Sequence, residues 1–566
     1  MLQQTLTPPV AGSNLPLRPG RVGIARPAFG TESLVFSVAC FLLLSGNGPF
    51  WRALLSGRAA SAPTTWLFAG AVFLALAALS TFMLCLLSGR RTVRPLLALV
   101  LLASAAATFY MERYGIYLDR AMLRNVLATD PREAADLLNG PLAAHVALFG
   151  VLPAALLWWP RLRPSNWPAA LARRLCWLLA MLALAAASLW PVFGDLASTM
   201  RNRREVRHLI TPGNLVAALA GNAWGSGSAP TGPRIVVGPD ARLNPAAWAR
   251  RERPVLFVLV LGETGRAANF SLAGYGRDTN PELSRRDVIS FSQVKACGTS
   301  TEVSVPCMFS PFGRAHYDEQ KIRSHESLLH VLARAGFQVL WRDNQSGCKG
   351  VCQGLPSEQL DDARVEALCA EGQCLDEVML HGMEGIARDA AGNLFVVMHQ
   401  MGSHGPAYFK RYPAVLKRFT PACESADLRH CSEAEIRNAY DNSVLYTDHF
   451  VARVVDFLGQ AQKRYDTAMI YVSDHGESLG EHGLYLHGMP YAIAPEVQTH
   501  VPMVMWLSER FRRSFRVNAE CLRNQAAAPA SHDNLFHSVL GVLDIQTSAY
   551  QRQLDLFAPC RTAARS

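Results

Sequence analysis

The sequence predicts two parts of different architecture: an N-terminal domain of five transmembrane helices, and then a soluble α/β domain with a mostly parallel central sheet. Three observations predict this division. Nearly all long apolar runs lie before residue 200, strand-like segments alternate with helical segments after residue 254, and ten of the thirteen cysteines lie beyond residue 290. We therefore expect a tail at 1–30, a transmembrane domain at 31–200, bridging helices and a linker at 201–254, and the soluble domain at 255–566.

The first thirty residues are rich in proline, glycine and arginine and have no helical pattern. We interpret residues 1–30 as a disordered cytoplasmic tail. A cleavable signal peptide is not expected, because several further apolar runs follow the first one.

Five apolar runs approach the roughly 20 residues that an α-helix needs to cross a bilayer. They cover residues 33–55, 65–88, 93–111, 141–160 and 175–195. The first run is interrupted by Gly46, Asn47, Gly48 and Pro49. A bundle of buried soluble helices is the alternative, but five long runs at such close spacing favour a membrane domain.

Arginines predict the orientation, because basic loops face the cytoplasm. The tail and the loops after the second and fourth runs carry them, so all three segments fall on one side and the soluble domain on the other. These residues are Arg18, Arg21, Arg26, Arg90, Arg91, Arg94, Arg161, Arg163, Arg173 and Arg174. Arg201, Arg203, Arg204 and Arg207 follow the last run on the far side, where they would suit anionic lipid headgroups.

Cysteine usage agrees with an oxidising compartment for the soluble domain. Eight cysteines form close pairs in sequence: Cys297 and Cys307, Cys348 and Cys352, Cys369 and Cys374, and Cys423 and Cys431. The rival interpretation is a structural zinc site, but regular CxxC spacing is absent. We expect four disulfides, with Cys521 and Cys560 as a candidate fifth pair.

Between the two parts, residues 203–210 and 214–223 are interpreted as helices separated by Pro212, and 225–239 as a linker rich in glycine, serine and proline. The best strand predictions in the soluble domain are 255–262, 337–342, 394–399, 468–473 and 502–506. The net charge of +10 requires no nucleic-acid partner, because arginines crowd around the ends of the apolar runs.

Candidate metal ligands follow two of these strands. Glu263 ends the first strand, and Asp474 and His475 end the fourth. Ligands gather beyond the carboxyl ends of parallel strands, so these side chains are expected to meet. Each alone is more often a turn or capping residue; the combination favours a zinc-type site, since a histidine ligand suits zinc better than magnesium or manganese.

A hydroxyl-rich segment between Cys297 and Cys307 supplies candidate nucleophiles for a site at these metal ligands. Metal coordination activates weak hydroxyl nucleophiles, and chemistry alone leaves Thr299, Ser300 and Thr301 open.

The motifs also resemble those of a known family. Gly262-Glu263-Thr264-Gly265-Arg266, the segment 297–310 and Trp341-Arg342-Asp343-Asn344 resemble lipid A phosphoethanolamine transferases, which include the mobile colistin-resistance enzymes. The segments 399–409, 473–478 and 485–490 do so as well, in the same order. The resemblance covers most of the chain and implies an alkaline-phosphatase-like α/β/α catalytic domain at 255–566.

The resemblance also implies site residues. Thr301 would be the nucleophile, and Glu263, Thr301, Asp474 and His475 would hold one zinc ion. His404 and His487, which without this context would be ordinary surface histidines, would flank the transferred phosphate or hold a second zinc. Independently of the resemblance, Lys349 lies in the turn between Cys348 and Cys352, where it could neutralise a phosphate oxygen that Ser346 could also bind. Gln345 departs from the asparagine expected in some relatives, which puts its contact with the donor in doubt.

Asn125, Thr129 and Glu133 match a polar set that the family uses to hold the ethanolamine head of the donor lipid. Capping is the structural alternative, because Asp130, Pro131 and Glu133 fit the first turn of a helix. The two roles are compatible.

The implied reaction is a ping-pong transfer of phosphoethanolamine from phosphatidylethanolamine to a phosphate of lipid A, by a monomer in the bacterial inner membrane with its catalytic domain in the periplasm. It would reduce surface negative charge and binding of polymyxins and cationic peptides.

The alternatives are transfer to another envelope glycan such as core heptose, a membrane-bound phosphatase or phosphodiesterase, and a phosphoglycerol transferase. A sulfatase is disfavoured, since Thr301 precedes Glu302 and Val303 instead of x-Pro-x-Arg. A metal-stabilised binding module is the non-enzyme alternative.

Overall fold

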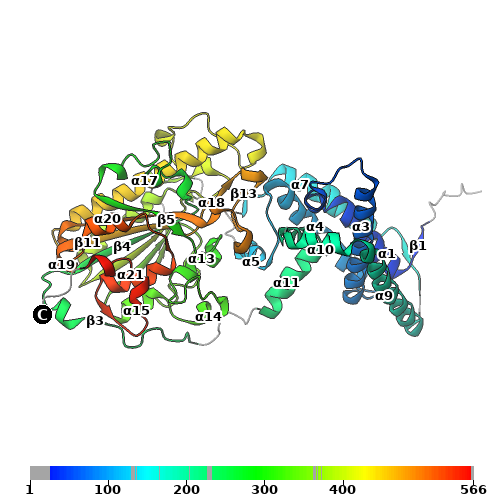
Figure 1. Ribbon diagram of the computed structural model, residues 1–566, viewed down its shortest axis with the longest axis horizontal. Coiled ribbons are helices and arrows are strands. Elements are labelled where there is room, and N and C mark those ends of the chain that lie inside the picture. Colours follow the sequence, from blue (N-terminus) through cyan, green and yellow to red (C-terminus); the bar gives the residue numbers. More distant parts are fainter. Residues whose placement is uncertain are drawn as a thin grey trace, which may run out of the picture.

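The structure is a computed structural model with a soluble domain at one end and apolar helices at the other (Figure 1). It describes residues 26–128, 134, 135, 137–164, 166–202, 204–225, 233–360, 365, 367–370 and 373–561. The predicted tail lies outside the described residues up to residue 25. Its end is ordered, because β1 (Ala28–Phe29) pairs with β2 (Arg161–Leu162), so the prediction of disorder up to residue 30 is wrong at these positions.

An eight-stranded sheet forms the centre of the soluble domain, in the order β15-β5-β14-β11-β4-β10-β6-β7. Five pairings are parallel, and the two that involve β14 are antiparallel. The sheet is therefore mixed. The strands are β4 (Val255–Gly262), β5 (Val288–Lys295), β6 (Gln338–Asp343), β7 (Ser357–Gln359), β10 (Leu394–His399), β11 (Asp466–Ser473), β14 (His500–Leu507) and β15 (Ala530–Ser531).

Five of these strands were predicted from their apolar runs, and two have the predicted bounds, β4 and β10. Every residue of β4, β10 and β11 is buried, because helices cover both faces of the sheet. The prediction missed β5, whose polar residues Ser290, Ser292 and Gln293 interrupt its apolar pattern.

Alternate residues of β4 enter two separate cores, as the two-residue period of a strand requires. Phe257 and Leu259 pack with one helical layer, whereas Val258 and Val260 pack with the other. The first layer contains α15 (Leu328–Arg334), α19 (Glu509–Phe515), α20 (Ala519–Gln525) and α21 (Asp533–Val542). The second contains α16 (Met383–Asp389) and the long α17 (Glu433–Ala461), which begins with a capping box between Ser432 and Glu435.

Three helices of the N-terminal part are long and apolar enough to cross a membrane: α3 (Pro63–Leu87), α4 (Val93–Tyr114) and the helical stretch Trp167–Ala197, which begins with α9 (Trp167–Leu189). A fourth span is present if α1 (Thr31–Ser45) and α2 (Gly48–Leu55), which meet at a bend of 63°, count as one. The fourth predicted run forms an apolar stretch of 17 residues, Gly140–Leu156. The described residues thus contain three or four candidate spans by length and composition, fewer than the five predicted.

The bend between α1 and α2 contains a fully buried asparagine. The Asn47 side chain donates to the carbonyl oxygens of Leu42, at 2.8 Å, and Thr211, at 2.9 Å, and accepts from the Thr211 amide at 2.8 Å. The amide thereby pairs backbone groups that the break exposes. It also ties the break to the bridging segment, which forms α10 (Phe193–Asn202), a 3-10 turn at Arg204–Leu209 and α11 (Gly213–Gly225).

The soluble domain carries all five disulfides: Cys297–Cys307, Cys348–Cys352, Cys369–Cys374, Cys423–Cys431 and Cys521–Cys560. The four predicted pairs and the candidate fifth pair are therefore confirmed. Cys40, Cys85 and Cys176, in the apolar helices, are free.

A buried ion pair joins the two parts. Arg113, in the last turn of α4, contacts Asp427 of the soluble domain, and their side chains are only 4% and 7% exposed. The next residue, Tyr114, packs into the second core of the soluble domain. The end of α4 therefore docks directly against the soluble domain.

We predict that Arg113→Met lowers the midpoint of thermal unfolding in detergent, because it leaves the buried Asp427 carboxylate with only the exposed His430 ring, 3.7 Å away, as a basic neighbour, at a cost of up to about 3–5 kcal/mol. The double variant Arg113→Met/Asp427→Asn should recover part of the loss, since the amide is neutral and can still accept from the Arg429 amide. A single variant as stable as the wild type would contradict this role.

Candidate active site

The parallel pairing of β4 and β11 brings the predicted metal ligands together. Gly262 and Ser473 are register partners at the carboxyl ends of the two strands. Glu263 and Asp474 therefore leave adjacent strands at the same edge of the sheet, and His475 follows directly. All three side chains are fully buried.

Glu263, Asp474 and His475 offer ligand atoms that lie within 4.8 Å of one another. The Nε2 atom of His475 lies 3.3 Å from Glu263 Oε1 and 3.3 Å from Asp474 Oδ2. Nδ1 of the same ring lies 2.9 Å from the carbonyl oxygen of Gly476. A carbonyl can only accept, so Nδ1 carries a proton, and Nε2 is the ring atom that faces the two carboxylates and would be available to a metal ion.

The donor set fits a cation. Asp474 Oδ1 accepts from the backbone amides of Thr264, at 3.1 Å, and His475, at 2.7 Å, while the buried Oδ2 faces the His475 ring at 3.3 Å and has no hydrogen-bond partner among the described residues. An unpaired buried carboxylate oxygen is costly unless a cation compensates it. Two carboxylates and one imidazole are also the mixed N and O donors that zinc accepts.

Electrostatics within the cluster are strongly perturbed. Burial and the neighbouring Glu263 raise the pKa of Asp474 to about 7. Burial acts to raise the pKa of Glu263 too, but His475 outweighs it and holds that pKa well below its usual range. Burial acts against the charge of His475, yet the two carboxylates raise its pKa to about 10. The cluster therefore has excess negative charge that calls for a positive partner.

Of the three candidate nucleophiles, Thr301 is the one that contacts this cluster. Its Oγ1 donates to Glu263 Oε2 at 3.0 Å and lies 3.3 Å from His475 Nε2. Thr299 instead donates to the carbonyl oxygen of Met489 at 2.6 Å. Geometry thus favours Thr301 among the three candidates that chemistry left open. It is also the first residue of α13 (Thr301–Met308), where the helix N-terminus favours negative charge.

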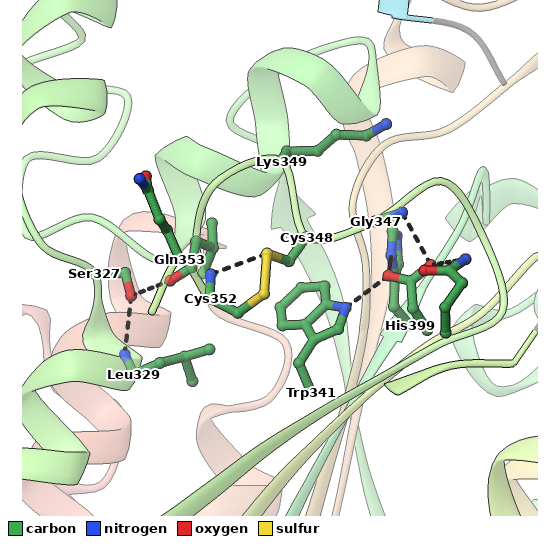
Figure 2. Close-up of a disulfide and its surroundings, with 12 residues drawn as sticks. Ser327, Leu329, Trp341, Gly347, Cys348, Lys349, Cys352, Gln353 and His399 are labelled. Carbon is green, nitrogen blue, oxygen red and sulfur yellow. Dashed lines mark hydrogen bonds and ion pairs between the residues drawn. A yellow bond between two sulfur atoms is a disulfide. The ribbon is translucent and has the colours of Figure 1, made fainter. Parts of the chain in front are cut away.

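Lys349 and Ser346 occupy a turn held by the Cys348–Cys352 disulfide. Figure 2 shows the Lys349 side chain extending away from the disulfide, and its Nζ donates to Ser346 Oγ at 2.6 Å. Lys349 has a φ of 48°, a left-handed conformation that non-glycine residues seldom adopt. The crosslink and the strained backbone together restrict where the ammonium can go.

Gln345 connects this turn to the metal-ligand cluster. Its Nε2 donates to Glu263 Oε2 at 3.2 Å, and its Oε1 accepts from Ser346 Oγ at 2.6 Å. The longer side chain that stands in place of the expected asparagine thus contacts a predicted metal ligand directly.

Asp343 anchors the same turn, a role that the sequence did not reveal. Its Oδ1 accepts from the amides of Gln345, at 2.8 Å, and Gly347, at 3.0 Å. Its Oδ2 lies 2.6 Å from Trp341 Nε1 and 3.0 Å from His399 Nδ1 (Figure 2). Burial acts to raise the pKa of Asp343, but His399 outweighs it and brings the pKa to about 2. Asp343 is therefore a charged acceptor at neutral pH.

The other two predicted histidines lie together beside the cluster. The ring centroids of His404 and His487 are 5.4 Å apart, and those of His475 and His487 are 4.4 Å apart. His487 Nδ1 lies 2.8 Å from Glu477, whose other oxygen accepts from Tyr408 at 2.6 Å. Sequence reasoning missed Glu477 and Tyr408 as positioning residues, although both lie within motif segments. Burial raises the pKa of Glu477 to about 8.

A cavity of about 400 Å³ joins the apolar helices to Thr301. Alanines and tyrosines of α4 and residues of α5 (Arg120–Ala128) and α11 form one end, and Thr301, Gln345, Ser346, Lys349, His404 and His487 form the other. Asn125 lines the cavity as well. Thr129 and Glu133 lie outside the described residues. The cavity is mostly apolar at the membrane side and polar at Thr301, as an amphipathic ligand would require.

Comparisons with known proteins agree with this arrangement. A model of the family "Phosphoethanolamine transferase EptA/EptB" matches residues 76–224, and the "Sulfatase" model matches residues 256–545. Phosphoethanolamine transferase EptA of Salmonella typhimurium is 40% identical over 472 residues, which cover 83% of this chain and 86% of the relative. Phosphatidylethanolamine transferase Mcr-1 of Escherichia coli is 40% identical over 429 residues, 74% of this chain and 79% of the relative.

A similar solved structure is that of the integral membrane protein lipooligosaccharide phosphoethanolamine transferase A from Neisseria meningitidis. It superposes with a TM-score of 0.89 at 34% identity and covers 95% of this chain and 100% of that chain.

We predict that Glu263→Gln and Asp474→Asn each weaken metal binding by more than about tenfold, because each removes one of the two anionic ligands. Metal content of the purified chain, measured by mass spectrometry, checks this. Asp441→Asn is the matched control, since that buried carboxyl group accepts from Asn269 and Tyr275 and stands outside the ligand cluster and away from the site histidines. Equal metal in all three variants would show that the ligands are wrongly assigned.

Proposed function

This chain belongs to the EptA family of phosphoethanolamine transferases, and we propose from that premise that it moves phosphoethanolamine from phosphatidylethanolamine to a phosphate of lipid A. It is a transferase of the bacterial inner membrane with its soluble domain in the periplasm. The proposal includes five spans, with the short stretch Gly140–Leu156 and the bent α1–α2 pair both crossing the membrane, and a monomeric protein.

One observation carries the proposal: the hydroxyl of Thr301 lies where the buried ligand cluster meets a cavity that opens toward the apolar helices. A diacylglycerol tail suits the alanine-lined end of that cavity, and a phosphate suits the end with Lys349 and the two histidines. An apolar cavity beside Thr301 favours a lipid donor over the soluble substrate of a phosphatase, and a hydroxyl at the ligand cluster favours an enzyme over a binding module.

We infer that the metal is zinc, held by Glu263, Asp474, His475 and Thr301. When bound, it would lower the pKa of the threonine hydroxyl and neutralise charge on the phosphate. The imidazoles of His404 and His487 are the place for a second zinc, if turnover uses two.

The chain's own residues account for the first half of the reaction. Thr301 Oγ1 loses its proton to solvent through the cavity, while Glu263 Oε2 at 3.0 Å holds the side chain in place, and Oγ1 forms a bond to the phosphorus of the donor. The bond from phosphorus to the glycerol oxygen breaks, and diacylglycerol leaves with a proton from His404 or His487, which line the cavity beside Thr301. Lys349 and Ser346 neutralise and bind the phosphate oxygens, which is the main requirement of phosphoryl transfer.

In the second half, a lipid A phosphate displaces Thr301 from the phosphothreonine intermediate. Each modified phosphate gains an ammonium group, which would weaken the binding of polymyxins and other cationic peptides. Asn125 lines the donor cavity, and we propose that it holds the ethanolamine head together with Thr129 and Glu133, whose carboxylate suits an ammonium.

We predict that Thr301→Ala lowers lipid A modification by about a thousandfold or more, because among the described residues only the Thr301 hydroxyl both contacts the cluster and lines the donor cavity; Thr264 also contacts Glu263 but does not line the cavity. Thr301→Ser is the matched control and should retain measurable transfer, since it keeps the oxygen. Mass spectrometry of lipid A from cells that express each variant gives the readout. Wild-type modification by Thr301→Ala at equal expression would refute the assignment.

We also predict that Ala106→Trp, which fills the lipid end of the cavity, lowers kcat/KM for phosphatidylethanolamine by about tenfold or more. Leu67→Trp places the same ring on α3, where Leu67 is 72% exposed and does not line the cavity, and should leave the rate unchanged. Kinetics in detergent micelles with increasing donor separate the two. Equal effects of both variants would mean that the cavity does not hold the donor.

A further inference from the structure

A second cavity, of about 420 Å³, lies at the opposite edge of the sheet from the active site. Arg253 and Asp466, which line it, stand at the starts of β4 and β11, whereas Glu263 and Asp474 follow the ends of the same strands. Eight residues of strand separate the two edges by about 26 Å. Figure 1 places α19, which forms one wall, at the end of the soluble domain away from the apolar helices.

This distal cavity is strongly basic. Six of its lining residues are arginines: Arg250, Arg251, Arg253, Arg510, Arg513 and Arg516. Only two lining residues are acidic, Glu252 and Asp466. Within the described part of the chain, Arg250, Arg510 and Arg516 form no ion pair with a carboxylate. The cavity therefore concentrates positive charge that the protein does not neutralise.

Arg251 is held rigidly in the wall of this cavity. Its guanidinium lies 3.5 Å from the ring centroid of Phe515 and 4.2 Å from that of Trp248, and Nη2 donates to Asp544 at 2.6 Å. The side chain is only 4% exposed, yet Nε and Nη1 have no hydrogen-bond partner in the described structure. Burial lowers the pKa of Arg251 to about 10, so it remains charged at neutral pH. Buried donors of a fixed guanidinium normally have acceptors.

Asp466 adds a second kind of partner. Its residue is 2% exposed, and Oδ1 lacks a hydrogen-bond partner among the described residues. A carboxylate can only accept, so it repels a bare anion and favours a group with hydroxyl donors. A ligand that satisfies both Asp466 and the arginines needs a phosphate and hydroxyl groups in one compact molecule.

We propose that the distal cavity binds a phosphorylated sugar, with its phosphate on the arginines and a hydroxyl donated to Asp466. Planar guanidinium groups bind phosphate oxygens in pairs, and a volume of several hundred Å³ suits a small ligand. The sugar phosphate is either free in solution or part of a larger phosphorylated glycan. This site is separate from the phosphoryl-transfer chemistry and does not depend on it.

Calorimetric titration of the full-length chain in detergent tests the proposal, with glucose 1-phosphate, glucose and inorganic phosphate as probes. Glucose 1-phosphate should bind at least about tenfold more tightly than either of the others. Deacylated lipopolysaccharide is the second arm: tighter binding of this glycan than of glucose 1-phosphate assigns the source to the envelope, and the reverse assigns it to a free metabolite.

Arg250→Gln/Arg510→Gln should weaken this binding by at least about tenfold and leave the transfer rate unchanged. Lys349→Gln, which removes a cation from the active-site turn, is the matched control and should leave it intact. Arg251→Lys keeps the charge but loses the planar fork, and should weaken binding as well. No binding of glucose 1-phosphate, binding lost only in Lys349→Gln, or binding of polyglutamate alone would overturn the proposal.

Discussion

The parallel register of β4 and β11 is the constraint on which the site depends. Because Gly262 pairs with Ser473, the next residues on the two strands are carboxylates that are buried side by side. Neither can move far, since both strands are buried on both faces by the helical layers. Two adjacent buried anions need positive charge nearby. His475 supplies part of this charge, and a metal ion would supply the rest.

The remaining site residues come from loops whose freedom is reduced. The Cys297–Cys307 disulfide closes the segment that presents Thr301, and the Cys348–Cys352 disulfide closes the turn that presents Lys349. Asp343 fixes that turn by two backbone hydrogen bonds. A rigid sheet with disulfide-closed loops at the ends of its strands suits phosphoryl transfer, because that reaction is catalysed mainly by positioning and by neutralisation of charge.

The apolar helices complete the site from the other side. The end of α4 docks onto the soluble domain through Arg113 and Tyr114, and the same helix lines the cavity that ends at Thr301. A headgroup in this cavity can approach the nucleophile while the lipid tails stay among apolar side chains. The docking contact and the lipid path therefore depend on one helix, which explains why the two parts are held close together.

The sequence predicted the centre of the sheet well, because strands buried on both faces appear as uninterrupted apolar runs. It did not predict β5, whose polar residues hide the strand, or the antiparallel direction of β14, which no local pattern encodes. It suggested Glu263, Asp474 and His475 from strand ends, and family resemblance selected Thr301 from three hydroxyls that spacing could not separate. The contacts of Gln345, Asp343 and Glu477 escaped prediction, because they join residues whose proximity arises only in the folded chain.

The most direct test of the central claim is a rapid-quench experiment without the acceptor. The purified, metal-loaded chain is mixed with phosphatidylethanolamine that carries a label in its headgroup. The account predicts a burst of diacylglycerol that matches the amount of enzyme, and one phosphoethanolamine group attached to a peptide that contains Thr301. Steady release of free phosphoethanolamine without a burst or a labelled peptide, or a label on another residue, would contradict it.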